Sequence, residues 1–149
     1  MIREASHKDF DEVYKIEQSC FVDPYPKHQL EYEFNENPLN KILVAVIDNK
    51  IVGFIDFMIT FNSATIVQIA IKKEYRKQGI ASSLLKEMEN CFPKDIEDVV
   101  ETVTLEVRKS NDAAIKLYEK NGYEFVVEKK HYYPNGEDAV YMVKRLLCQ

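Results

Sequence analysis

The feature that most constrains this chain is the stretch from Val67 to Met88, which reads VQIAIKKEYRKQGIASSLLKEM. Its apolar beginning predicts a strand. Its end predicts a helix, because apolar side chains recur on one face at Ile80, Leu84, Leu85 and Met88. Basic side chains crowd the turn between them, at Lys72, Lys73, Arg76 and Lys77. Since helix starts favour anions, the stretch predicts a polyphosphate loop, although basic turns also occur in loops that bind nothing.

Two other nucleotide-binding loops are excluded by the glycines of the chain. A Walker loop needs a Gly-Lys pair, and no such pair occurs here. A dinucleotide fingerprint needs three closely spaced glycines, whereas this turn holds only Gly79.

The turn resembles the signature R/Q-x-x-G-x-G/A of the GNAT acetyltransferases, with Arg76-Lys77-Gln78-Gly79-Ile80-Ala81 in its place. The resemblance implies that acetyl-CoA is the cofactor. It also implies that backbone amides near Gly79 hold the pyrophosphate and that the end of the preceding strand holds the pantetheine arm and the thioester oxygen. The expected cofactor-binding residues are Ile69, Ala70, Ile71, Arg76, Lys77, Gln78, Gly79, Ile80, Ala81 and Ser82.

Length and composition favour one domain, residues 1–149, with a sizeable core, since 46% of the 149 residues are hydrophobic. A net charge of −5 argues against a general nucleic-acid binder. The chain shows no long apolar run, no secretory signal and no metal-like histidine spacing, so we expect no membrane span and no metal. Cys20, Cys91 and Cys148 form no C-x-x-C pair, which favours a cytoplasmic location; Cys148 could cross-link chains on oxidation.

Periodicity predicts the element order β-α-α-β-β-β-α-β-α-β-β and therefore a mixed α/β sheet with helices on both faces. This order resembles the GNAT fold, a mostly antiparallel twisted sheet, and the resemblance implies strands splayed at mid-sheet around CoA. The expected ranges are 1–4, 6–20, 27–35, 41–47, 51–60, 64–71, 80–88, 102–107, 111–121, 124–132 and 139–146. Asp48-Asn49-Lys50 is expected to join 41–47 and 51–60 as a hairpin.

A base for acetyl transfer is expected in the strand Thr102–Val107, where Glu106 alternates with apolar residues. A strand with one solvated face explains the same pattern. The segment LEVRKSNDAAIKLYEKNGY, however, resembles the ribosomal-protein-alanine N-acetyltransferase branch of the family. That resemblance implies Glu106 as general base, Tyr118 as general acid that also contacts the cofactor, and Asn111 as a CoA contact. A phenol with a pKa near ~10 lies within about two units of a thiol near ~8.5, which suits the role of Tyr118 as acid. From the residues alone, Tyr118 could instead be core packing and Asn111 a helix cap.

The acceptor side is expected at Tyr132 and Tyr133, because HYYP followed by EDA resembles the same branch, and at Tyr25 within Pro24-Tyr25-Pro26. The family has a Pro-Trp-Ser-like stretch at the latter place, and a hairpin turn alone would explain Pro134-Asn135-Gly136. The predicted activity is direct acetyl transfer to a protein N-terminal amine, with a ribosomal protein as one candidate acceptor. The alternatives are transfer to lysine or a small-molecule amine, a non-catalytic acyl-CoA sensor, and an acidic interaction module without a ligand.

Overall fold

The computed structural model describes residues 1–146, and the chain divides into two compact units. Unit 1 comprises Met1–Met58 and Val67–Cys91, and unit 2 comprises Ile59–Ile66 and Phe92–Gln149. Strand β4 (Ser63–Ile71) contributes its first half to unit 2 and its second half to unit 1. Cys148, for which we considered cross-linking, lies outside the described residues.

The strands of unit 1 form an antiparallel meander. Strand β1 (Ile2–Glu4) pairs with β2 (Asn40–Ile47), and β2 pairs with β3 (Lys50–Thr60). Asp48 and Asn49 connect β2 and β3 with φ values of 50° and 64°. Positive φ at both residues is typical of the tight hairpin turns whose twist matches that of the strands. The predicted hairpin is therefore confirmed.

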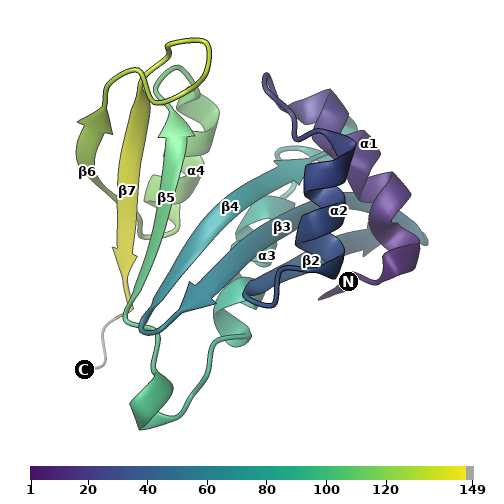
Figure 1. Cartoon of the computed structure of the whole chain (residues 1–149), viewed down its shortest axis with the longest axis horizontal. Coiled ribbons are helices and arrows are strands. Elements are labelled where there is room, and N and C mark those ends of the chain that lie inside the picture. The colour runs from purple at the N-terminus through teal and green to yellow at the C-terminus, as the bar shows by residue number, and fades with distance from the viewer. Residues whose placement is uncertain (147–149) are drawn as a thin grey trace. The chain divides into compact units, whose positions relative to one another are not determined.

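Helices cover both faces of these strands (Figure 1). Helices α1 (Phe10–Cys20) and α2 (Lys27–Asn35) lie on one face, and α3 (Ile80–Asn90) lies on the other. The apolar stripe of α3 is buried as its spacing predicts. Leu84 and Met88 are both 0% exposed.

A glycine controls how closely β3 approaches the end of β4. A Cβ atom on Gly53 would lie 2.5 Å from Ile71 Cδ1 and 2.9 Å from the carbonyl oxygen of Ala70. The backbone oxygen cannot give way easily, so a side chain at Gly53 would push these strands apart.

Unit 2 is built on β5 (Thr102–Arg108), β7 (Ala139–Arg145) and β6 (Glu124–Lys129), with α4 (Asp112–Lys120) beside them. Strand β7 pairs antiparallel with both β5 and β6, and the start of β4 pairs parallel with β5 from Ser63 to Thr65. Strand β5 alternates as predicted, with Val103, Leu105 and Val107 buried. Gly122 ends α4 with φ of 96°, as expected of a left-handed residue after a helix.

The observed element order equals the predicted one once short 3-10 turns at 7–9, 73–75 and 96–98 are set aside. The strands follow the hydrogen-bonded order β1-β2-β3-β4-β5-β7-β6, so the predicted mixed α/β fold is confirmed. Several boundaries differ by one to four residues, and the end of β6 is one of them. Strand β6 ends at Lys129 rather than Tyr132, because His131 takes φ of 52° and donates its backbone N–H to Asp138 at 2.9 Å. Among the described residues no helix is long and apolar enough to span a membrane.

Two carboxylates are fully buried in unit 1, at Glu17 and Asp56, each 0% exposed. Asp56 Oδ1 accepts a short hydrogen bond from the Asn40 side chain. Desolvation raises the pKa of Asp56 well above its ordinary value, and the neighbouring carboxylates Glu33 and Glu17 raise it further. The folded state therefore favours the protonated acid at this position.

Asp56→Asn should change how stability depends on pH. An acid whose pKa is higher in the folded state destabilises the fold as pH rises from its unfolded value, about 3.9, through the folded value, by about 1.4 kcal/mol per pKa unit. The free energy of unfolding of Asp56→Asn should therefore fall less than that of the unmodified protein between about pH 4 and pH 8. Denaturant unfolding at several pH values measures this.

Asp9→Asn is a control of opposite sign. The Arg3 guanidinium, 2.7 Å away, lowers the pKa of Asp9, so this carboxylate stabilises the fold above its unfolded pKa. Asp9→Asn should lose stability relative to the unmodified protein as pH rises. Parallel pH curves for Asp56→Asn and the unmodified protein would contradict the proposed burial effect.

Candidate active site

The predicted phosphate loop of unit 1 has an unusual backbone between β4 and α3. Lys77 and Gly79 both take left-handed conformations, with φ of 64° and 82°. Gly79 is the N-cap of α3, and its carbonyl accepts the first helical hydrogen bond, from Ser83 N at 3.0 Å. The N–H groups of Ile80 and Ala81 precede that donor, in a first turn without acidic residues. Closely spaced left-handed residues before a helix start are typical of anion-binding loops.

Arg76 fastens this loop to the end of β4. Its Nε donates to the Ile71 carbonyl at 2.9 Å, and its guanidinium also contacts Cys20 Sγ at 3.5 Å. Gln78 Nε2 lies 3.5 Å from the Glu74 carbonyl. Two predicted cofactor residues thus shape the loop through their side chains, whereas Lys77 and Gly79 are exposed at its tip.

The strand residues expected to meet the thioester arm lie at the end of β4. Ala70 and Ile71 are 6% and 8% exposed, and Ile69 is half-buried. Ala70 packs in the core cluster with Val13, Ile16 and Phe54. Burial therefore limits what Ala70 and Ile71 can offer a ligand to their backbone groups.

Glu106, the predicted base, lies in unit 2 beside a lysine that the sequence analysis missed. Lys129 Nζ donates to Glu106 Oε2 at 2.6 Å, and this contact raises the pKa of Lys129. The Lys129 ammonium also lies 4.7 Å from the Tyr141 ring centroid and 5.5 Å from that of Tyr132. A carboxylate with two aromatic rings forms a site for a cation.

Tyr118, the predicted acid, is buried at 5% exposure and makes an edge-to-face contact with Tyr123, with ring centroids 5.7 Å apart. Burial raises the pKa of the Tyr118 phenol well above its ordinary value, and nearby Tyr133 raises it further. This finding overturns our sequence argument that a phenol near ~10 lies within about two units of a thiol near ~8.5. Tyr118 is instead a phenol that stays protonated, and so remains a donor, at neutral pH.

Tyr133 interacts electrostatically with both predicted catalytic groups. Burial raises the pKa of Tyr133 to about 12, with Tyr132 and Glu106 adding to the rise and Arg108 opposing it. The Arg108 guanidinium lies 4.1 Å from the Tyr133 ring centroid. Unit 2 thus brings Glu106, Tyr118 and Tyr133 together.

Asn111 serves as the N-cap of α4, and its Oδ1 accepts from Ala114 N at 3.1 Å. The cap that the residues alone predicted is confirmed. Its expected CoA contact stays a prediction.

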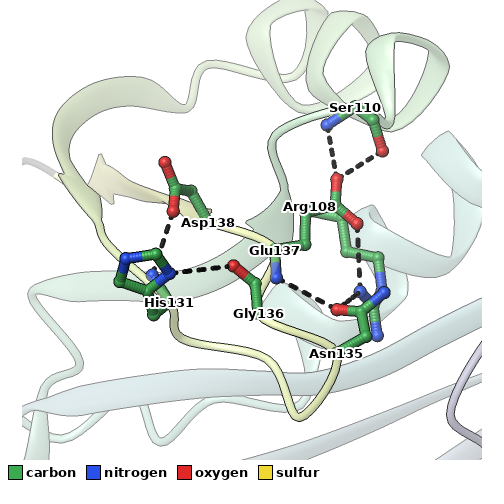
Figure 2. A network of polar contacts seen from close by, with 7 residues as sticks. All are labelled: Arg108, Ser110, His131, Asn135, Gly136, Glu137 and Asp138. Atoms are coloured by element: carbon green, nitrogen blue, oxygen red, sulfur yellow. Dashed lines mark hydrogen bonds and ion pairs between the residues drawn. The ribbon is translucent and has the colours of Figure 1, made fainter.

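The loop that carries Tyr132 and Tyr133 is held by a polar network (Figure 2). Glu137 accepts from Arg108 at 3.0 Å and from the Ser110 backbone N–H at 3.0 Å, and it makes a further short hydrogen bond to the Ser110 hydroxyl. These donors lower the pKa of Glu137. Glu137 thereby ties the tyrosine loop to the segment just before α4.

Tyr25, the third expected acceptor residue, lies in unit 1 on the connection between α1 and α2. Its ring packs against the apolar core cluster of that unit. Its backbone N–H donates to Glu17 at 2.9 Å, and its carbonyl accepts from Gln18 at 2.9 Å. Within residues 1–146 we find no group of three or more His, Cys, Asp or Glu arranged to hold a metal.

Comparison with known proteins gives consistent matches along the whole chain. The profile of the acetyltransferase (GNAT) family matches residues 10–123. An N-alpha-acetyltransferase of Saccharolobus solfataricus is 34% identical over 157 aligned residues, covering 97% of this chain and 92% of the relative. The [ribosomal protein bS18]-alanine N-acetyltransferase of Escherichia coli is 32% identical over 137 residues, covering 90% and 89%.

The fold is shared with solved structures. The crystal structure of the ribosomal-protein-S18-alanine N-acetyltransferase from Escherichia coli superposes with a TM-score of 0.85 at 28% identity, covering 100% of this chain and 95% of that chain. The predicted family resemblance and GNAT fold are therefore confirmed.

Gly79→Ala tests the loop. A side chain there meets nothing within 4 Å, but φ of 82° costs an L-residue about 1–2 kcal/mol. We expect that loss of stability together with a weaker affinity for acetyl-CoA, measured by calorimetry. Gly136→Ala is the matched control, because Gly136 also has an open surrounding and φ of 88°. It should lose similar stability and keep its affinity; equal affinities in both variants would argue against this loop as the phosphate site.

Proposed function

Because the chain belongs to the acetyltransferase (GNAT) family, we propose that it transfers the acetyl group of acetyl-CoA directly to the N-terminal α-amine of a protein. The single observation that carries this proposal is Glu106 in contact with a primary ammonium, that of Lys129, at 2.6 Å. Two relatives with 32–34% identity are named for acetylation of α-amines or of an N-terminal alanine. A ribosomal protein is one acceptor that these names suggest.

The loop of unit 1 suits the diphosphate of the cofactor. Its N–H groups before Ser83 are neutral donors at the positive end of α3, and Gly79 presents no side chain to a ligand. Lys72, Lys73 and Lys77 supply positive charge in a chain whose net charge is −5. The backbone of Ile69–Ile71 would then accommodate the thioester arm.

The residues of unit 2 would handle the protons. Acetyl-CoA supplies an activated thioester carbonyl. Glu106 takes one proton from the acceptor ammonium and later releases it to solvent. The freed amine attacks the carbonyl carbon, and the C–S bond breaks as the nitrogen loses its second proton to solvent. Tyr118 donates a hydrogen bond or proton to the departing thiolate. Its raised pKa keeps that proton available at neutral pH.

Tyr132 and Tyr133 of unit 2 are proposed contacts of the acceptor N-terminus, and Tyr25 of unit 1 is proposed separately as a contact. Tyr132 is 48% exposed and stands edge-to-face with Tyr133, with centroids 5.0 Å apart. Rigid aromatic side chains offer contact area at low entropic cost. We further propose that both units work as one catalytic domain in the cytoplasm. The family match spans residues of both, and Cys20 and Cys91 are free thiols.

A peptide library with varied first residues tests the proposal. The protein with acetyl-CoA should release CoA and place acetyl on the α-amine, as mass spectrometry of the product will locate. Glu106→Gln and Tyr118→Phe should each lower kcat about 10²–10⁴-fold, because each removes a proton-transfer group. Acetyl on lysine or on a small amine would replace the proposed acceptor class. Binding of acetyl-CoA without turnover would indicate a sensor, and no binding would indicate an interaction module.

Matched controls separate chemistry from packing. Glu128→Gln removes a carboxylate of β6 that pairs with Lys109 at 3.0 Å and Lys130 at 2.6 Å. Tyr123→Phe removes a phenol from the ring that contacts Tyr118. Both should retain kcat within a few fold. Comparable losses in the controls and the test variants would remove Glu106 and Tyr118 from the mechanism.

Lys129→Gln should lower KM for the acceptor peptide. In the proposal the acceptor ammonium takes the place of Lys129 Nζ beside Glu106, so the lysine competes with it. KM for acetyl-CoA should stay unchanged. Lys130→Gln is the control, since Lys130 pairs with Glu128 and Asp138 rather than with Glu106. An acceptor KM that rises or does not move in Lys129→Gln would rule out this competition.

A further inference from the structure

A buried carboxylate that the proposed mechanism does not use holds the connection between α1 and α2. Glu17, in the last half of α1, is 0% exposed. Its Oε2 accepts from the backbone N–H of Tyr25 at 2.9 Å and from Gln68 Nε2 at 2.9 Å. Gln68 belongs to β4 and directly precedes Ile69. One carboxylate thus joins three segments of unit 1: helix α1, the connection at 21–26, and the part of β4 expected to meet the cofactor.

Backbone donors are scarce in the part of this connection that carries Tyr25. In Pro24-Tyr25-Pro26 only Tyr25 carries a backbone N–H, because proline has none. That donor goes to Glu17, and the Tyr25 carbonyl accepts from Gln18 at 2.9 Å. The consecutive side chains of Glu17 and Gln18 therefore hydrogen-bond both backbone groups of Tyr25.

Burying the Glu17 carboxylate costs folding free energy, which indicates that this side chain does more than fill the core. Both donors to Glu17 are neutral amides, and desolvation raises the pKa of Glu17 more than they lower it. Its second oxygen is buried without a hydrogen-bond partner among the described residues, as are Asp56 Oδ2 and Gln68 Oε1. An apolar side chain would suit this place better if packing were the only requirement.

We infer that Glu17 is a positioning residue that sets the conformation of the connection at 21–26, and through it the affinity for the acceptor. The inference rests on the proposed function, in which Tyr25 contacts the acceptor N-terminus. Glu17 itself touches neither substrate. It acts by holding the Tyr25 backbone against α1 and β4.

Glu17→Leu removes the acceptor oxygen, fills the space and leaves the Tyr25 N–H without its partner. With the peptide that the unmodified protein acetylates best, the acceptor KM should rise about tenfold or more, because the Tyr25 N–H loses its buried hydrogen-bond partner. The acetyl-CoA KM should change less than twofold. Glu17→Gln keeps an oxygen in place and should restore the acceptor KM to within a few fold. Faster hydrogen exchange at the Tyr25 amide in Glu17→Leu reports the loosened connection independently of activity.

Two more variants complete the test. Asp56→Asn is the matched control, since Asp56 is equally buried nearby but bonds Asn40 of β2 instead of the connection; its acceptor KM should not change. Gln18→Ala removes the hydrogen bond to the Tyr25 carbonyl from an exposed position. We expect a smaller rise in acceptor KM for this variant, which provides the test if Glu17→Leu does not fold. An unchanged acceptor KM in Glu17→Leu and Gln18→Ala, with an active unmodified protein, would overturn the inference alone. No turnover by the unmodified protein would overturn the proposed function, and the inference with it.

Discussion

The end of β4 at Ile71 is the point on which the proposed phosphate loop of unit 1 depends. There the chain leaves the sheet, and two backbone groups are held by hydrogen bonds: the Ile71 carbonyl accepts from Arg76 Nε at 2.9 Å, and Lys72 N donates to the Val52 carbonyl at 2.8 Å. Gly53 lets β3 come close enough for this arrangement. With its start fixed, the short loop can hold Lys77 and Gly79 in left-handed conformations, which a freely moving loop would relax.

Local patterns were enough to predict much of the architecture. The spacing of Leu84 and Met88 gave the buried face of α3, and the alternation in β5 placed Glu106 on the face opposite Val103 and Leu105. Both follow from the periods of helix and strand, which each segment carries by itself. The order of elements and the turn at Asp48-Asn49 are local in the same sense.

What the sequence could not show were contacts that depend on register and burial. Lys129 of β6 contacts Glu106 of β5 across β7. The register of β6 against β7 shifts between Phe125 and Val127, and no residue type in the sequence indicates this shift. The depth at which Tyr118 lies likewise depends on tertiary packing. The sequence did carry a signal for the buried role of Glu17, because this residue lies beside Ile16 on the apolar face of α1. An acidic side chain on a buried helix face is unusual and predicts a specific hydrogen-bond partner.

The contact between Glu106 and Lys129 also bears on which amine is acetylated. A carboxylate at 2.6 Å raises the pKa of an amine, as it does for Lys129, and so makes the reactive neutral form scarcer. An α-amine starts from a pKa of about 7.7–8.0 and a lysine from about 10.4, a difference worth roughly 3 kcal/mol in the free energy of deprotonation at pH 7. In the same environment a single carboxylate base can therefore deprotonate an α-amine, whereas a lysine such as Lys129 stays charged. This favours the N-terminal amine as the acceptor and explains how a lysine can sit against the proposed base without being the preferred substrate.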